Sequence, residues 1–135
     1  MVENAVVKEQ LTDDMVDGGA QLVRKLDEMG LSVPAALWLF DPEINEWRLL
    51  IASPSVSEAG PQEVYRRIEE ARKSLGQEGA QIPLSSIGLL PMNHELVGLL
   101  GIAMDTGNSI ARIRFSKSSI NGHFIDDALI YRSAA

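Results

Sequence analysis

The dipeptide Asn121-Gly122 constrains the fold of this chain more than any other feature. It lies between two runs of alternating apolar and polar residues, within the segment 110–132. A two-residue type I′ turn needs a positive φ at both positions, which glycine adopts freely and asparagine tolerates better than most residues. The pattern therefore predicts an antiparallel β-hairpin in which Ile120 faces His123 across the turn.

Counting back from the turn assigns the side chains of the hairpin to two faces. The apolar face carries Ala111, Ile113, Phe115, Ala128 and Ile130, and the outer face carries Arg112, Arg114, Ser116, Asp127, Leu129 and Tyr131. Residues 110–135 contain four basic and two acidic side chains, in a chain whose formal net charge is −7. A basic face that also carries apolar side chains is typical of a contact surface. The sequence therefore predicts an interaction surface formed by Arg112, Arg114, Ile125, Leu129 and Tyr131.

The length and composition indicate one folded domain. The chain has 135 residues, of which 45% are hydrophobic and 23% are charged, as is typical of a folded soluble protein. No stretch rich in Pro, Gly or Ser divides it, so we expect an N-terminal tail at residues 1–10 and a single domain at residues 11–135. The chain contains no cysteine, which excludes disulfides, thiolate metal sites and a cysteine nucleophile.

The hydrophobic periodicity predicts helices that alternate with strands. Helices are expected from Thr12 to Met29, from Pro61 to Leu75 and from His94 to about Met104, and strands at 35–40, 47–53, 82–90 and in the two arms of the hairpin. This order predicts an α/β fold, with α+β as the alternative, built on a mixed sheet of about five strands. Right-handed crossovers within one sheet would make the second, third and fourth strands parallel.

Three segments carry further expectations. Gly18-Gly19 would weaken the first helix by roughly 1 kcal/mol per glycine relative to alanine, so the pair indicates close approach of another backbone rather than a phosphate-binding turn. Residues 53–60 form a small polar loop that we expect to be mobile. The helix at 94–104 has almost no polar side, so it should be buried or lie in an oligomer interface.

The chain shows no sign of a targeting segment or of a known cofactor motif. Residues 1–10 lack the basic start and apolar core of a signal peptide, and polar residues interrupt the most apolar window, so we expect a cytoplasmic protein that does not enter the membrane. An acidic domain repels phosphate backbones, which argues against general nucleic-acid binding. Dinucleotide-binding, Walker-type and nucleophile-elbow glycine patterns are absent, so we expect neither a cofactor nor a metal.

His123 and Asp127 are the candidate catalytic residues. On a regular strand they point to one face, while Asp126 points to the other, so they could form an acid–base pair. The structural alternative is that Asp126 pairs with Lys117, that Asp127 bonds a nearby serine or arginine, and that the turn exposes His123. His94 begins a helix but lacks the second histidine that a zinc-peptidase helix requires.

The C-terminal block resembles the end of small bacterial proteins of unknown function. The residues that carry the resemblance are Ile113-Arg114-Phe115-Ser116, Ile120-Asn121-Gly122-His123-Phe124-Ile125 and Ile130-Tyr131-Arg132. The resemblance implies a bacterial origin. It implies no activity, and it assigns no site residues.

Three functions are compatible with these features. The first is a non-enzymatic interaction or accessory module that forms a homo-oligomer or binds a protein partner, favoured by the apolar third helix and the uneven charge. The second is a hydrolase or nuclease-like enzyme that uses His123 with Asp127, joined by His94 or Glu95. The third is a small-ligand sensor with a pocket near Trp38 and residues 53–60.

Overall fold

The computed structural model describes residues 7–134 and has a single α/β domain built on a mixed five-stranded sheet. The helices are α1 (Asp13–Glu28), α2 (Ser55–Glu58), α3 (Pro61–Ser74), α4 (Gln77–Ala80) and α5 (Glu95–Ala103), with a 3-10 turn η1 at Leu84–Ser86. The strands are β1 (Ala35–Asp41), β2 (Glu46–Ala52), β3 (Ile87–Leu90), β4 (Ile113–Ile120) and β5 (His123–Ser133). The predicted fold class and the C-terminal hairpin are therefore confirmed.

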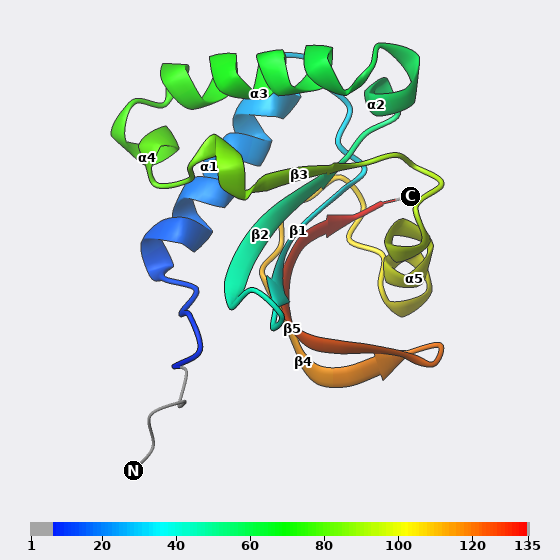
Figure 1. Cartoon of the computed structure of the whole chain (residues 1–135). Helices are drawn as coiled ribbons and strands as arrows, with labels where there is room; N and C mark the ends of the chain where they lie inside the picture. The colour runs from blue at the N-terminus through cyan, green and yellow to red at the C-terminus, as the bar shows by residue number, and fades with distance from the viewer. Residues whose placement is uncertain (1–6, 135) are drawn as a thin grey trace.

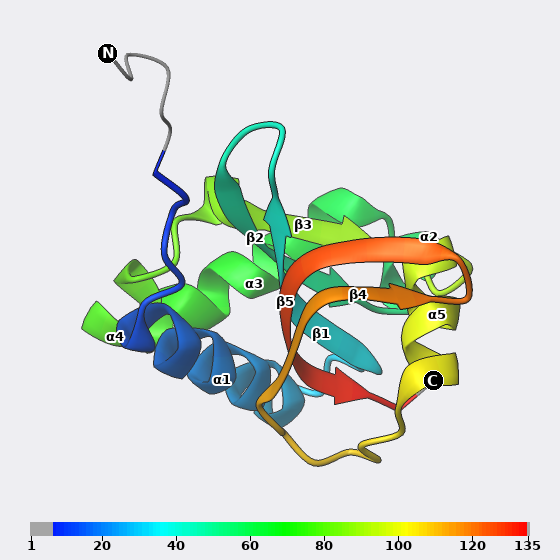
Figure 2. The same ribbon diagram turned by 90° about the horizontal axis from the view of Figure 1, so that it is seen from below.

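The strands lie in the order β3-β2-β1-β5-β4 (Figure 1). β2 and β3 are parallel, as the crossover predicts, and the remaining pairs are antiparallel. The prediction that the fourth strand is parallel to the second and third is wrong. β5 is antiparallel to β1, and β4 is antiparallel to β5, so β4 lies at the opposite edge and runs against β2 and β3. Figure 2 shows the segment after α5 running past the end of β5 before it enters β4, and Thr106 N–H donates to the Ser133 carbonyl at 2.9 Å on this path.

Helices cover the two faces of the sheet unequally. α1 and α3 lie together on one face, where Leu22, Trp38, Leu49 and Ile68 belong to the main core (Figure 1). α5 lies on the other face, where Leu99 and Leu100 pack with Leu37, Ala128 and Ile130. Because α5 has only nine residues, it covers one end of its face and leaves Leu39 and Leu50 only partly buried. None of the described helices has the length and apolar character needed to cross a membrane.

Gly19 marks the closest contact between α1 and the sheet. Tyr131 donates its hydroxyl hydrogen to the Val16 carbonyl at 2.6 Å and accepts from Trp38 Nε1 at 2.8 Å. A Cβ at Gly19 would collide with that hydroxyl, while one at Gly18 would lie 3.1 Å from the backbone oxygen of Glu78. The expectation of close packing at this glycine pair is confirmed, although the atoms that approach Gly19 belong to side chains.

Three segments differ from the sequence prediction. Residues 53–60 were expected to form a mobile loop but contain α2, whose start is held by the Ser53 hydroxyl oxygen accepting from the Ser55 N–H at 3.2 Å. The segment after α3, for which the sequence predicts no helix or strand, contains the short helix α4. The third strand begins at Ile87 rather than Ile82, because Pro83 lacks an N–H and the following residues form η1.

The C-terminal hairpin has the predicted register, with Ile113, Phe115 and Ile120 opposite Ile130, Ala128 and His123. Asn121 and Gly122 have φ values of 49° and 84°, as the type I′ turn requires. One feature was not predicted: Lys117 also has a positive φ of 48°, which interrupts the regular alternation of side chains. In β5 the alternation is also interrupted, since Ile125 packs in the same cluster as Ala128 and Ile130, on the α5 face.

Candidate functional site

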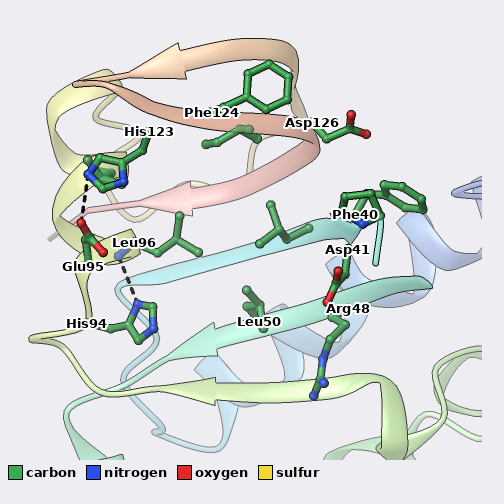
Figure 3. A pocket seen from close by; sticks show the side chains of 14 residues that line it. Phe40, Asp41, Arg48, Leu50, His94, Glu95, Leu96, His123, Phe124 and Asp126 are labelled. Carbon is green, nitrogen blue, oxygen red and sulfur yellow. Dashed lines mark hydrogen bonds and ion pairs between the residues drawn. The ribbon is translucent and has the colours of Figure 1, made fainter. Parts of the chain in front are cut away.

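A cleft of about 440 Å³ opens on the α5 face of the sheet. In Figure 3 the tip of the hairpin arches over β1 and β2, and α5 closes one end. The lower part of the cleft is aliphatic and is formed by Leu39, Leu50, Leu96, Leu99 and Ile125. Both the volume and the apolar lining are typical of sites that bind small molecules.

The cleft exists because the helix α5 is short and covers only part of the sheet face. At its start the Nδ1 atom of His94 accepts a hydrogen bond from the Leu96 N–H at 3.1 Å, which satisfies one of the free donors of the first turn. The helix ends at Ala103, and Leu39 and Leu50 of the neighbouring strands remain only partly buried. The open face therefore consists of sheet residues that α5 is too short to cover.

Polar and aromatic side chains form the rim. The Nε2 atom of His123 lies 3.0 Å from a carboxylate oxygen of Glu95 and so joins the hairpin tip to α5 (Figure 3). Phe124, on the same tip, is 63% exposed. Asp126 accepts from Lys117 at 3.0 Å, and this hydrogen bond lowers the pKa of the Asp126 carboxyl.

Arg48 differs from all other arginines of the chain. The other seven each donate at least one side-chain hydrogen bond within the protein. Arg48 has no ion pair or side-chain hydrogen bond with a described residue, and its Nε atom is buried without a partner. Its guanidinium passes over Gly88, where an added Cβ would lie 3.2 Å from Nη2. Gly88 is therefore in tight contact with this side chain and with Leu50.

Asp127 is the centre of a separate polar cluster beside the N-terminal segment. Its carboxylate accepts two hydrogen bonds of 2.7 Å from Arg114, one of 2.7 Å from Ser116 and one of 2.8 Å from Lys8. Burial raises the pKa of Asp127, but the hydrogen bonds from these donors outweigh it and hold the pKa far below its usual range. Lys8 also lies 4.5 Å from the centre of the Phe40 ring, so part of the expected tail contacts the domain. Residues 1–6 of that tail lie outside the described residues.

The structure brings His123 together with Glu95 and not with Asp127. His123 lines the cleft, whereas Asp127 lines a different cavity with Lys8, Trp47 and Arg114. The expectation of a shared face assumed a regular strand, whereas in β5 Ile125 packs toward α5 and Asp127 bonds Lys8 and Arg114. These residues instead have the non-catalytic roles given as the alternative above. Asp126 pairs with Lys117, and Asp127 bonds Ser116 and Arg114.

The predicted interaction surface is only partly exposed. Ile125, Leu129 and Tyr131 are buried, the last two beneath α1 on the opposite face from Ile125. Arg112 and Arg114 remain accessible, but they bond Asp17 and Asp127 of the same chain. The basic side chains of the hairpin therefore act within the domain, and the five residues do not share one outer face.

The site expected for a small-ligand sensor also lies elsewhere. Trp38 is fully buried in the α1–α3 core, and Ser53 is buried as well. The cleft occupies the opposite face of the sheet. Sequence reasoning missed it because residues 35–40 are apolar on both faces of the strand, which is typical of a strand covered on both sides. Arg48, the charged residue among the apolar residues that follow Glu46 in β2, was the available signal.

Neither metal-binding geometry within the described residues nor similarity to known proteins identifies a ligand. Within residues 7–134, no group of three or more His, Asp or Glu side chains is arranged to hold a metal ion. Comparisons with protein-family models, curated proteins and solved structures found no match. The function is therefore inferred from the geometry and chemistry of the cleft.

Proposed function

We propose that this protein is a ligand-binding module and that the cleft between α5 and the sheet is its binding site. The observation that carries the proposal is the uncovered aliphatic surface of Leu39, Leu50 and Leu96 inside a concave site of about 440 Å³. Apolar surface left in contact with water gains free energy when a ligand covers it. The polar rim can then select among ligands that fill the apolar part.

The roles of the rim residues favour binding over the hydrolase alternative. Glu95 is paired with His123, and Asp126 with Lys117. His94 uses Nδ1 to cap α5. A general acid or base acts on a group within hydrogen-bond reach of its proton, and these side chains already use their polar atoms in contacts that hold the hairpin and α5 in place.

We expect octanol to bind in the cleft with a dissociation constant on the order of 1 mM, as suits a ligand of this size. Amide NMR spectra recorded during a titration should show saturable shifts at Leu39, Leu50 and Leu96. The Leu39→Trp variant should bind at least tenfold more weakly, because the larger side chain fills the cleft. Ile44→Trp is the matched control, since Ile44 is an exposed apolar residue in the β1–β2 turn. Shifts scattered over the surface, or equal binding by Leu39→Trp, would contradict the proposal.

Self-association through α5 is a second candidate function, and the exposure of Ile102 favours it. This side chain is 68% exposed, and the neighbouring Ala103 is exposed as well. The helix has one charged residue, Glu95, so the same face of a second copy can pack against it with little of the repulsion expected between two chains of net charge −7. The occupant proposed for this face is therefore a second copy of the chain.

For Ile102→Lys, we expect a shift from dimer to monomer in sedimentation velocity, because two buried lysines would face each other across a symmetric contact. Ile44→Lys places the same charge on another exposed isoleucine and should leave the sedimentation unchanged. A wild-type protein that stays monomeric at the highest soluble concentration would rule out this second function and would leave the ligand-binding proposal unaffected.

A further inference from the structure

We propose that the ligands of the cleft are aliphatic carboxylates and that Arg48 binds their carboxylate group. This inference rests on the proposed ligand-binding function and adds the chemical class of the ligand. It combines two observations on the same face of the sheet: an aliphatic floor and an arginine without a partner among the described residues.

The register of the sheet places Arg48 beside the aliphatic floor. Arg48 lies opposite Leu39 in the β1–β2 pair, and it precedes Leu50 by two residues on the same strand. Residues two apart on a strand point to the same face, so the arginine and both leucines line the same cleft. Figure 3 shows the Arg48 side chain extending from β2 across β3. Gly88 of β3 leaves the space through which the guanidinium passes.

The bonding state of Arg48 indicates what it can recognise. A guanidinium has five N–H donors in a planar fork that matches the two oxygens of a carboxylate. Other arginines of this chain bind a carboxylate of the same protein. Arg114 binds Asp127 and Arg132 binds Asp27, each through two nitrogens. Arg48 has no such acceptor, and a ligand carboxylate would supply it with charge-assisted hydrogen bonds.

The acidic groups around the cleft do not occupy Arg48. Glu95 is paired with His123, and Asp126 with Lys117. Asp41 accepts from the backbone N–H of Glu43 at 3.0 Å, within the β1–β2 turn. Two of the three carboxylates facing the cleft thus have cationic partners or partners that become cationic on protonation, which limits their repulsion of an incoming anion.

The remaining lining fits the hydrocarbon part of the ligand. Five aliphatic side chains, contributed by β1, β2, α5 and β5, line the same cleft as Arg48. Each methylene buried there should tighten binding by about fourfold. An alkyl chain that ends in a carboxylate can therefore bury its chain on the leucines while the carboxylate meets the guanidinium.

The test compares octanoate with octanol, which have the same chain length and differ in charge. For the wild-type protein we expect octanoate to bind at least tenfold more tightly than octanol in amide NMR titrations, and butanoate to bind more weakly than octanoate. Arg48→Gln should abolish the preference for octanoate and change octanol binding by less than about threefold. Arg66→Gln removes an arginine from the exposed face of α3 and should leave both affinities unchanged.

Arg48→Lys keeps the positive charge and tests the inference if the glutamine variant does not fold. It should retain a smaller preference for octanoate, because an ammonium group lacks the planar fork. Equal affinity of the wild type for octanoate and octanol, or an unchanged preference in Arg48→Gln, would overturn the carboxylate inference and leave the ligand-binding proposal standing. If neither compound shifts the cleft residues, both proposals fail.

Discussion

Gly19→Ala is expected to lower the free energy of unfolding by about 2–4 kcal/mol, although alanine is the better helix former. The new methyl group would overlap the Tyr131 hydroxyl and would lie 2.9 Å from Trp38 Nε1. Both side chains are fully buried, so neither can move aside without disturbing the core. Any shift would also break a hydrogen bond that joins Tyr131 to Trp38 or to Val16. Urea denaturation followed by circular dichroism measures the loss.

Gly98→Ala provides the matched control for this substitution. Gly98 also lies inside a helix, but a Cβ there would meet nothing within 4 Å. Alanine should therefore stabilise the protein by up to about 1 kcal/mol through helix propensity alone. In a Tyr131→Phe background, which lacks the clashing oxygen, Gly19→Ala should cost less than in the wild type. A Gly19→Ala protein as stable as the wild type would show that the contact is not as close as described.

Local signals in the sequence predicted the parts of this fold that depend on neighbours in the chain. The Asn121-Gly122 turn set the hairpin register because each pair of opposed residues follows from the turn by counting. The start of α1 was equally local, since the Thr12 hydroxyl accepts from the Met15 N–H within one helical turn. Such features need no knowledge of the rest of the molecule.

Features that depend on distant contacts were not predictable in this way. A positive φ at Lys117 is uncommon for a residue with a long side chain. The face on which Ile125 packs cannot be read from alternation either. The position of β4 depends on the pairing of β5 with β1, which lies almost one hundred residues away. The pairing of His123 with Glu95 likewise joins segments that only the folded chain brings together.

For the cleft, too, the sequence predicted the individual elements but not the open area between them. The sequence placed Leu39 and Leu50 in strands, and the composition of α5 indicated that the helix should be buried or lie in an interface. The open area results from the difference between the length of α5 and the area of the face it covers. That difference arises only when the strands and the helix are assembled. The residues that line the cleft are of the types found in any protein core, so no sequence motif marks the site.

Asp127→Asn is expected to lower the free energy of unfolding by about 2–3 kcal/mol at neutral pH, where the wild-type carboxylate is charged. The side chain of Asp127 is only 7% exposed, and an amide would place two N–H donors among the donors of Arg114, Lys8 and Ser116. The cluster joins the N-terminal segment to the hairpin, so its loss should also expose Trp47. Chemical denaturation, with tryptophan fluorescence as the signal, measures both effects.

The pH dependence of the free energy of unfolding distinguishes the contribution of the Asp127 charge from that of an ordinary packing contact. The pKa of Asp127 is lower in the folded protein than in the unfolded chain, so its contribution to stability is fully present above the unfolded pKa of roughly 4 and is lost as the pH falls below it. The wild type should therefore lose stability steeply in acid, and Asp127→Asn less steeply. Asp17→Asn is the control, because Asp17 and its partner Arg112 are both largely exposed and their ion pair should contribute less than about 1 kcal/mol. Equal acid sensitivity of the wild type and Asp127→Asn would mean that the carboxylate is not held in its charged form by this cluster.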